Sequence, residues 1–424
     1  MTQMVSRRGA GIMTALVDGI TALDWSIRGA ASVVRCACEI GCAAIVLCSL
    51  AFSSSEASAE SRADTQAQPA GKARIDADGT VHLPAMAVPL SSYMSEEAKR
   101  LFIGEGAGFF QNLSPDLSIA QLRRAADDHY YRPILDRTKA RYPVTIEERK
   151  IGGVPTYVVT PRDGVAPGNQ QRVLVNFHGG GFIIGAGPGQ IIESIPIAAV
   201  GKIKVISVDY RMAPEHHFPA ASEDAARVYA ELLKHYQPRN VGFYGCSAGG
   251  ELSAQAVAWL QHQKLPQPGA IGIFGAGAYG SHTGSPTDAH VWGGDSRYMV
   301  PPLNGGTPLR PSSFNWRYWK TDYLAGLSKA DLVSPLVAPA LSPDVLKRFP
   351  PTLLITATRA VDLSAAVQTH RLLTNAGVEA DLHVWDGLPH CFIGDADLPE
   401  AREAYRVITR FFDKHLGNEV AHPR

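Results

Sequence analysis

One serine in the sequence lies in a setting that suits covalent chemistry. The run GCSAGG, residues 245–250, follows a short apolar segment and precedes residues with apolar positions at helical spacing. This order predicts a buried strand, a tight turn carrying Ser247, and a helix. Glycines two positions before and after the serine let neighbouring backbone approach, because they lack a Cβ. A hydroxyl exposed on such a turn, at a helix N-terminus, is placed to act as a nucleophile.

A second glycine-rich run suits the stabilisation of an oxyanion. The run HGGG, residues 178–181, comes directly after the apolar segment 173–177. Consecutive glycines let backbone N–H groups point at a ligand, as an acyl-transfer intermediate with a charged oxygen requires. His178 could itself be proposed as a base, but its place beside the glycines fits a structural hydrogen-bonding role better.

The predicted general base is His390, on the loop that follows the last apolar strand, 380–385. Its imidazole would take the serine proton during attack and return it to the leaving alcohol. His383 alternates within the preceding strand and is interpreted as a packed or surface residue.

The elements that must position these side chains alternate between strands and helices. The expected strands are 144–149, 154–160, 173–177, 204–208, 241–244, 270–274, 352–356 and 380–385. Helical patterns separate most of them, which predicts a doubly wound α/β sheet. Residues 277–349 interrupt this rhythm and are interpreted as a substrate-covering insertion. The helical patterns within 91–143 precede the sheet and are expected to form part of a cap.

The run DYRMAPEHHFPAA, residues 209–221, completes a pattern of three motifs. HGGG, then DYRxAPExxxPA, then GxSAGG resembles the hormone-sensitive-lipase-like branch of the α/β-hydrolases, also called bacterial family IV esterases. The resemblance covers about residues 145–416. It implies the α/β-hydrolase fold: a mostly parallel eight-stranded sheet with helices on both faces and a helical cap. It also implies hydrolysis of carboxylic esters without a cofactor, with Ser247 as nucleophile and the backbone N–H groups of Gly180, Gly181 and Ala248 as oxyanion donors.

The triad acid departs from the family pattern. The family usually carries D-P-L after the seventh strand, with the aspartate in the triad, and Ala360 occupies that position here. Asp362 lies two residues further on and is the predicted acid, because a triad is defined by geometry and not by sequence position. The alternatives are Asp395 and Asp397, just past His390.

Two cysteines flank the predicted catalytic residues. Cys246 precedes Ser247, where family members most often carry Asp or Glu, and Cys391 follows His390. Both are interpreted as free thiols that serve as small buried hydrophobic side chains, with an oxidation-sensitive pair as the alternative. No C-x-x-C pair or His/Cys cluster has zinc spacing, so no metal site is predicted.

The composition and the N-terminal segment indicate which kinds of binding partner and which cell compartment to expect. The 424 residues carry a formal net charge of zero, with no basic excess that would suggest nucleic acid. Residues 1–59 contain arginines, then the apolar run 40–52, then Ala57-Ser58-Ala59, a pattern typical of a secretory signal. The apolar run is too short to cross a bilayer comfortably. We therefore expect export to the periplasm or medium without a membrane partner, with an uncleaved anchor as the alternative.

The sequence predicts a signal segment at 1–59, a linker or disordered stretch at 60–90, cap helices at 91–143 and a hydrolase domain at 144–417. The predicted partner is a small ester of short to medium acyl length, and a homodimer is possible. Two alternatives stay open: a lactone or amide hydrolase of the formamidase type, and a non-catalytic homologue that binds a small ligand.

Overall fold

The computed structural model describes residues 73–77, 79, 81–82, 89–103, 114, 117–279 and 323–417, all within the compact unit Ala70–Arg424. The predicted signal segment and the centre of the predicted insertion, 280–322, lie outside the described residues. Across the part of the chain that is described, no helix is both long and apolar enough to cross a membrane.

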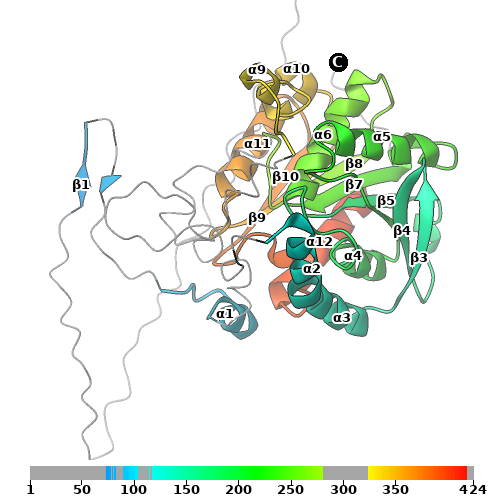
Figure 1. Cartoon of the computed structure of the whole chain (residues 1–424), viewed down its shortest axis with the longest axis horizontal. Coiled ribbons are helices and arrows are strands. Elements are labelled where there is room, and N and C mark those ends of the chain that lie inside the picture. The colour runs from blue at the N-terminus through cyan, green and yellow to red at the C-terminus, as the bar shows by residue number, and fades with distance from the viewer. Residues whose placement is uncertain are drawn as a thin grey trace, which may run out of the picture. The chain divides into compact units, whose positions relative to one another are not determined.

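An eight-stranded sheet forms the centre of the fold (Figure 1). Its strand order is β10-β9-β8-β7-β5-β6-β4-β3, and only the pairings of β4 with β3 and β6 are antiparallel. Its strands are β3 (Val144–Ile151), β4 (Val154–Pro161), β5 (Val173–Phe177), β6 (Lys204–Val208), β7 (Val241–Cys246), β8 (Ala270–Phe274), β9 (Thr352–Ala357) and β10 (Ala380–Trp385). A separate antiparallel pair joins β1 (Arg74–Ile75) to β2 (Val81–His82).

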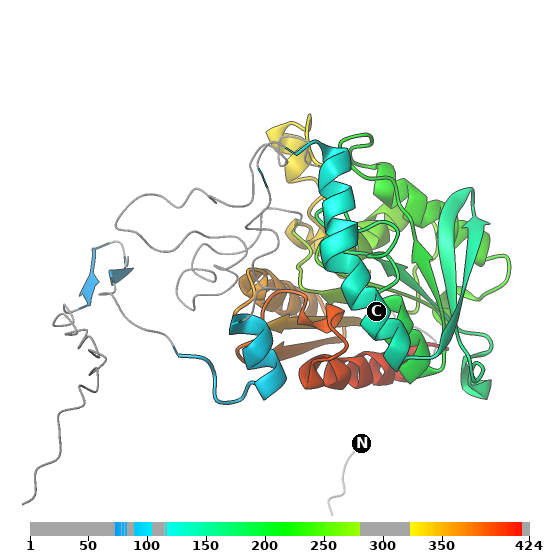
Figure 2. The ribbon, with the colours of Figure 1, turned by 60° about the horizontal axis from the view of Figure 1, so that its bottom comes forward.

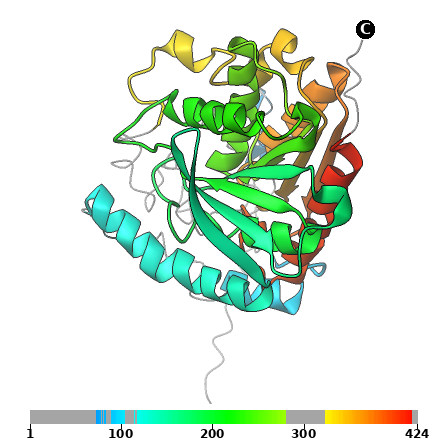
Figure 3. The ribbon, with the colours of Figure 1, turned by 90° about the vertical axis from the view of Figure 1, so that its right-hand side faces the viewer.

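Helices cover both faces of the eight-stranded sheet (Figure 3). One face packs against α5 (Ala220–Leu232), α6 (Ala248–His262) and α11 (Leu363–Asn375), and the other against α4 (Ser194–Gly201) and α12 (Pro399–His415). The shorter elements are η3 (Pro167–Asn169), η4 (Pro238–Asn240), α9 (Lys329–Leu332), η6 (Pro339–Leu341), α10 (Pro343–Leu346) and η7 (Phe392–Gly394).

The helices that precede the sheet lie in the predicted cap region. They are α1 (Glu96–Ile103), α2 (Ile119–Ala126) and α3 (Arg132–Arg141), and the π-helical η2 (Asp127–Tyr131) joins α2 to α3 in one continuous rod (Figure 2). The hydroxyl of Ser118 accepts the N–H of Gln121, whose side chain accepts the N–H of Ser118, so a capping box begins the rod.

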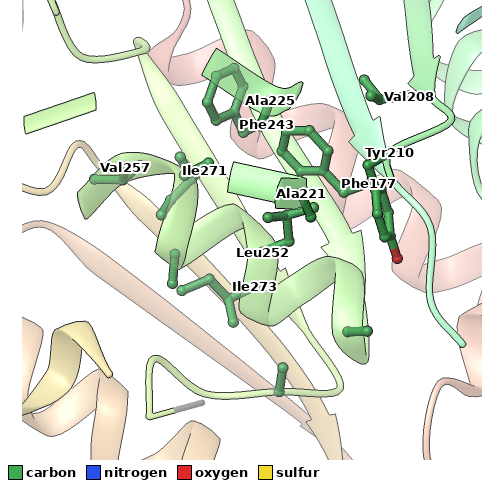
Figure 4. Close-up of a cluster of buried hydrophobic side chains, with 14 of the residues drawn as sticks. Phe177, Val208, Tyr210, Ala221, Ala225, Phe243, Leu252, Val257, Ile271 and Ile273 are labelled. Carbon is green, nitrogen blue, oxygen red and sulfur yellow. The ribbon is translucent and has the colours of Figure 1, made fainter. Parts of the chain in front are cut away.

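The two hydrophobic cores follow from the two-residue repeat of the strands. In β7, Phe243 points into the core under α5 and α6, whereas Tyr244 points into the core under α4 and α12. Residues at successive positions of a strand face opposite sides, so fully apolar strands such as β5 supply both cores at once. Figure 4 shows Phe177, Phe243, Leu252 and Ile271 meeting in the first core.

Candidate active site

Ser247 occupies the turn between β7 and α6, at the carboxyl ends of the parallel strands. Its backbone angles are φ 58° and ψ −126°, which a non-glycine residue adopts only when the surroundings impose it. A Cβ at Gly245 or Gly249 would lie 2.1 Å or 1.8 Å from the carbonyl oxygen of Phe177. The predicted strand, turn and helix are therefore present, and the two glycines are needed because the backbone of β5 passes directly beside the turn.

The HGGG run forms the loop after β5 and adjoins this turn. A Cβ at Gly179 would lie 3.4 Å from Cβ of Ser247. Gly180 and Gly181 have φ values of +116° and +62°, a region that favours glycine. No acceptor among the described residues pairs with their backbone N–H groups. These donors are thus available to a ligand beside the serine.

His178 stabilises this loop through its contacts with Tyr210. Its ring stacks on Tyr210, with centroids 4.3 Å apart, and Tyr210 donates its hydroxyl proton to the carbonyl oxygen of His178 at 2.7 Å. Burial lowers the pKa of His178 to about 4, so the ring is neutral at physiological pH. Among the described residues, no carboxylate contacts His178 to orient it as a base.

His390 and Asp362 meet above the ends of β9 and β10. Nδ1 of His390 lies 2.7 Å from Oδ1 of Asp362, and the hydroxyl of Thr356 donates to Oδ2 of Asp362 at 2.6 Å. A carboxylate only accepts, so Nδ1 carries the proton and Nε2 keeps its lone pair. Asp362 is 6% exposed, so its carboxylate is shielded from water, whereas the His390 ring is partly exposed.

The turn after β9 explains why the acid is displaced by two positions. Ala360 is buried, and its N–H bonds to the carbonyl oxygen of Ala357 at 3.1 Å, which closes a tight turn. Asp362 then lies directly before α11, and its carboxylate contacts the side chain of Thr356 at the end of β9. The alternatives Asp395 and Asp397 form ion pairs with arginines of α3.

The interpretation of Cys246 and Cys391 as free thiols is wrong. The two sulfurs form a disulfide between residues 145 positions apart, with Cα atoms separated by 6.0 Å. A Cβ at Gly275 would lie 2.8 Å from each sulfur and 3.2 Å from Cε1 of His390. The backbone N–H of Ser247 donates to the carbonyl oxygen of Phe274, the residue before Gly275. The serine turn and the histidine loop are therefore neighbours on either side of Gly275.

Comparison with known proteins matches this architecture. A sequence profile described as alpha/beta hydrolase fold matches residues 174–394, just over half of the chain. The chain belongs to this alpha/beta hydrolase family. The predicted fold class is thereby confirmed.

Esterases of the same fold are similar to this hydrolase over most of its length. The crystal structure of an esterase named E25 has 31% identity and a TM-score of 0.66, covering 79% of this chain and 98% of the esterase. An esterase from the bacterial hormone-sensitive lipase family has 28% identity and a TM-score of 0.61, covering 76% and 99%. These two structures confirm the resemblance to that branch.

Curated relatives match a shorter part of the hydrolase. Versiconal hemiacetal acetate esterase of Emericella nidulans is 30% identical over 137 residues, which is 31% of this chain and 46% of the esterase. This match spans less than half of the length of that relative.

A buried carboxylate that the motifs do not reveal lies beneath the hydrolase site. Glu193, just before α4, accepts hydrogen bonds from the backbone N–H of Cys246 and from the side chain of Asn176, both at 3.1 Å. It also accepts the backbone N–H of Gly179. Burial raises the pKa of Glu193 to about 7, although these hydrogen bonds favour its charged form. Glu193 thus ties the HGGG loop to the serine turn. No spacing in the sequence indicates this contact.

The cap region is tied to the HGGG loop through α2. The guanidinium of Arg123 donates to the carbonyl oxygens of Ile183 and Ala213, each at 2.8 Å, and to both carboxylate oxygens of Glu215. Glu215 belongs to the DYRMAPE motif, whose N–H of Ala213 bonds to the carbonyl oxygen of Phe182 at 2.9 Å. The second motif therefore braces the glycine loop and links it to the preceding helix.

Proposed function

We propose that this chain is a serine hydrolase that cleaves short- to medium-chain carboxylic esters through an acyl-enzyme intermediate. The observation that carries the proposal is the chain of contacts from Thr356 to Asp362 to His390, on a loop bonded to the turn that holds Ser247. A serine on a strained turn, an imidazole oriented by a carboxylate and free backbone donors are the parts that acyl transfer requires.

Acylation follows from the protonation state of His390. Nε2 takes the proton of the Ser247 hydroxyl while its oxygen attacks the ester carbonyl carbon. The negative oxygen of the tetrahedral intermediate accepts hydrogen bonds from the N–H groups of Gly180, Gly181 and Ala248. Collapse breaks the bond to the alcohol oxygen, which receives the proton from Nε2, and leaves the acyl group on Ser247.

Deacylation repeats these steps with water as the nucleophile. His390 accepts a proton from the water, whose oxygen attacks the acyl carbon, and then returns that proton to the oxygen of Ser247. The carboxylic acid leaves, and the enzyme regains its starting state. Asp362 holds the imidazole in one tautomer and stabilises its charged form in both halves.

The expected substrate length comes from the resemblance to esterases with a cap. The comparisons support ester chemistry, because the similar structures are named esterases and one curated relative is named for an acetate ester. Arg123 anchors α2 to the loop that carries the oxyanion donors, and this contact supports a role for the preceding helices in a cap that limits acyl length.

The test is the rate of hydrolysis of p-nitrophenyl esters from acetate to laurate. We expect the highest kcat/KM at short to medium acyl length, and Ser247→Ala should lose essentially all turnover while keeping the wild-type circular dichroism spectrum. Ser253→Ala is the matched control, because the Ser253 hydroxyl bonds within α6 to the carbonyl oxygen of Gly249. Appreciable turnover by Ser247→Ala would refute the mechanism. A folded wild type inactive on every ester would instead favour lactones, amides or a ligand-binding role.

A further inference from the structure

We propose that the Cys246–Cys391 disulfide positions His390 against Ser247, so that turnover depends on the redox state of these two sulfurs. This inference rests on the proposed function. The bond joins the residue directly before the nucleophile to the residue directly after the base. Among the described residues, no other covalent cross-link joins the loops that carry Ser247 and His390.

The two ends of the bond are anchored very differently. Cys246 is the last residue of β7 in the middle of the sheet, is 2% exposed, and donates its N–H to Glu193. Cys391 lies on the loop after β10, an edge strand that pairs with β9 alone among the described strands. The disulfide therefore fastens a loop from the sheet edge to the rigid centre that holds Ser247.

The local backbone shows that the loop is held in a restricted conformation. Cys391 has φ 51° and ψ 34°, in the left-handed region that few non-glycine residues occupy. Such conformations persist where surrounding structure imposes them. The disulfide is one such constraint, and it acts on the residue adjoining the catalytic imidazole.

The sulfur of Cys391 also contacts the reactive side of the imidazole. It lies 3.7 Å from Nε2 of His390, the nitrogen that must receive the serine proton. Gly275 leaves room for both sulfurs beside the ring, since a Cβ there would come within 2.8 Å of each. When the disulfide is reduced, the two sulfurs separate to van der Waals distance. The loop that carries His390 then moves with Cys391.

Reduction by a dithiol has a defined course. Cys391 is partly exposed whereas Cys246 is buried, so a thiolate of dithiothreitol attacks the sulfur of Cys391 and releases Cys246 as a thiolate. The second thiol of the reagent, as its thiolate, then attacks the mixed disulfide and releases Cys391. Dithiothreitol is oxidised to its cyclic disulfide, and the enzyme gains two thiols.

The experiment measures kcat and KM for p-nitrophenyl butyrate in oxidised and dithiothreitol-reduced full-length protein, with thiols identified by alkylation and mass spectrometry. A misplacement of about 1 Å costs a reaction about 100-fold, so we expect kcat to fall about 10- to 100-fold on reduction, with KM changed less than threefold. Reoxidation with glutathione disulfide should restore kcat. Cys246→Ala/Cys391→Ala should be slow with or without reductant.

The matched control replaces Cys36, Cys38, Cys42 and Cys48 by serine, and this variant should respond to reduction as the wild type does. A second readout is the rate at which a p-nitrophenyl phosphonate labels Ser247, which requires the oriented imidazole but no ester turnover. Reduced protein that keeps the oxidised kcat and labelling rate overturns the proposal. A lower melting temperature with unchanged kcat also overturns it, because the bond would then act only on stability. Absence of ester hydrolysis in oxidised protein, with redox-dependent labelling, refutes the proposed substrate and retains the positioning role.

Discussion

Replacing Asp362 by asparagine isolates the contribution of one carboxylate charge to the catalytic geometry. The side chain is 6% exposed and makes two contacts, one from Oδ1 to Nδ1 of His390 at 2.7 Å and one from Oδ2 to the Thr356 hydroxyl at 2.6 Å. Asparagine has the same shape, so the packing is retained while the charge is lost. The substitution therefore tests how the Asp362 carboxylate orients the His390 ring and stabilises its charged form, without creating a cavity.

The size of the effect follows from the two ways in which asparagine can be seated. If its NH₂ group faces His390, Nδ1 must accept, the ring proton moves to Nε2, and the nitrogen facing the serine loses its lone pair. If its oxygen faces His390, the tautomer is kept but the charged imidazole loses its partner. The first arrangement removes the base, and the second removes the charge that stabilises the protonated imidazole. We therefore expect kcat to fall about 10³- to 10⁴-fold, or about 4–5.5 kcal/mol in barrier height.

The assay compares kcat for p-nitrophenyl butyrate between wild type, Asp362→Asn and the control Asp395→Asn. Asp395 is the same residue type near His390 in sequence, but its carboxylate pairs with Arg137 at 3.3 Å. We expect Asp395→Asn to keep kcat within threefold and Asp362→Asn to keep its melting temperature within a few degrees. A drop of only a few-fold in folded Asp362→Asn, with a larger drop in Asp395→Asn, would refute the assignment of the triad acid.

Two further predictions concern the elements around the nucleophile. Gly249→Ala should destabilise the fold by about 3 kcal/mol or more, because its Cβ would lie 1.8 Å from a backbone oxygen, whereas Gly168→Ala meets no atom within 4 Å and should change stability by less than about 1 kcal/mol. Urea unfolding of both variants measures this, and equal stabilities would contradict it. Glu193→Gln should remove a pH dependence of folding, since burial raises the pKa of Glu193 from 4.5 to about 7. Between these values the folded wild type retains a proton that the unfolded chain releases, so its stability relative to the variant should fall by roughly 3 kcal/mol as pH rises from 4.5 to 7. A difference in unfolding free energy that stays constant with pH would refute the environment described for Glu193.

Much of the fold could be predicted from the sequence because the relevant signals are local. Apolar runs such as 173–177 and 241–244 become central strands, since a strand buried on both faces needs hydrophobic side chains at successive positions. The glycines around Ser247 mark a turn that the backbone of β5 touches. Three motifs in a fixed order then indicated the branch of the family that the similar structures confirm.

The candidate site was only partly predictable, because its decisive contacts join distant positions. The sequence favours Asp362 over Asp395 and Asp397 only by its place after the seventh strand. The tight turn after β9 brings its carboxylate to His390, 28 positions away. The role of Glu193 cannot be recognised in the sequence, because Glu193 contacts Cys246 across 53 positions and belongs to none of the three motifs.

The sequence by itself determined the strand pattern, the order of the motifs and the residue types able to do acyl-transfer chemistry. Local backbone sterics and hydrophobic burial depend on a few neighbouring residues, so both can be predicted from the order of amino acids. Only the tertiary structure decided which aspartate orients His390 and whether Cys246 and Cys391 are thiols or a bond. A disulfide requires two sulfurs to meet in space. Residues 145 positions apart meet here because Cys246 ends β7 and Cys391 follows β10, and both lie at the carboxyl ends of the parallel strands of one sheet.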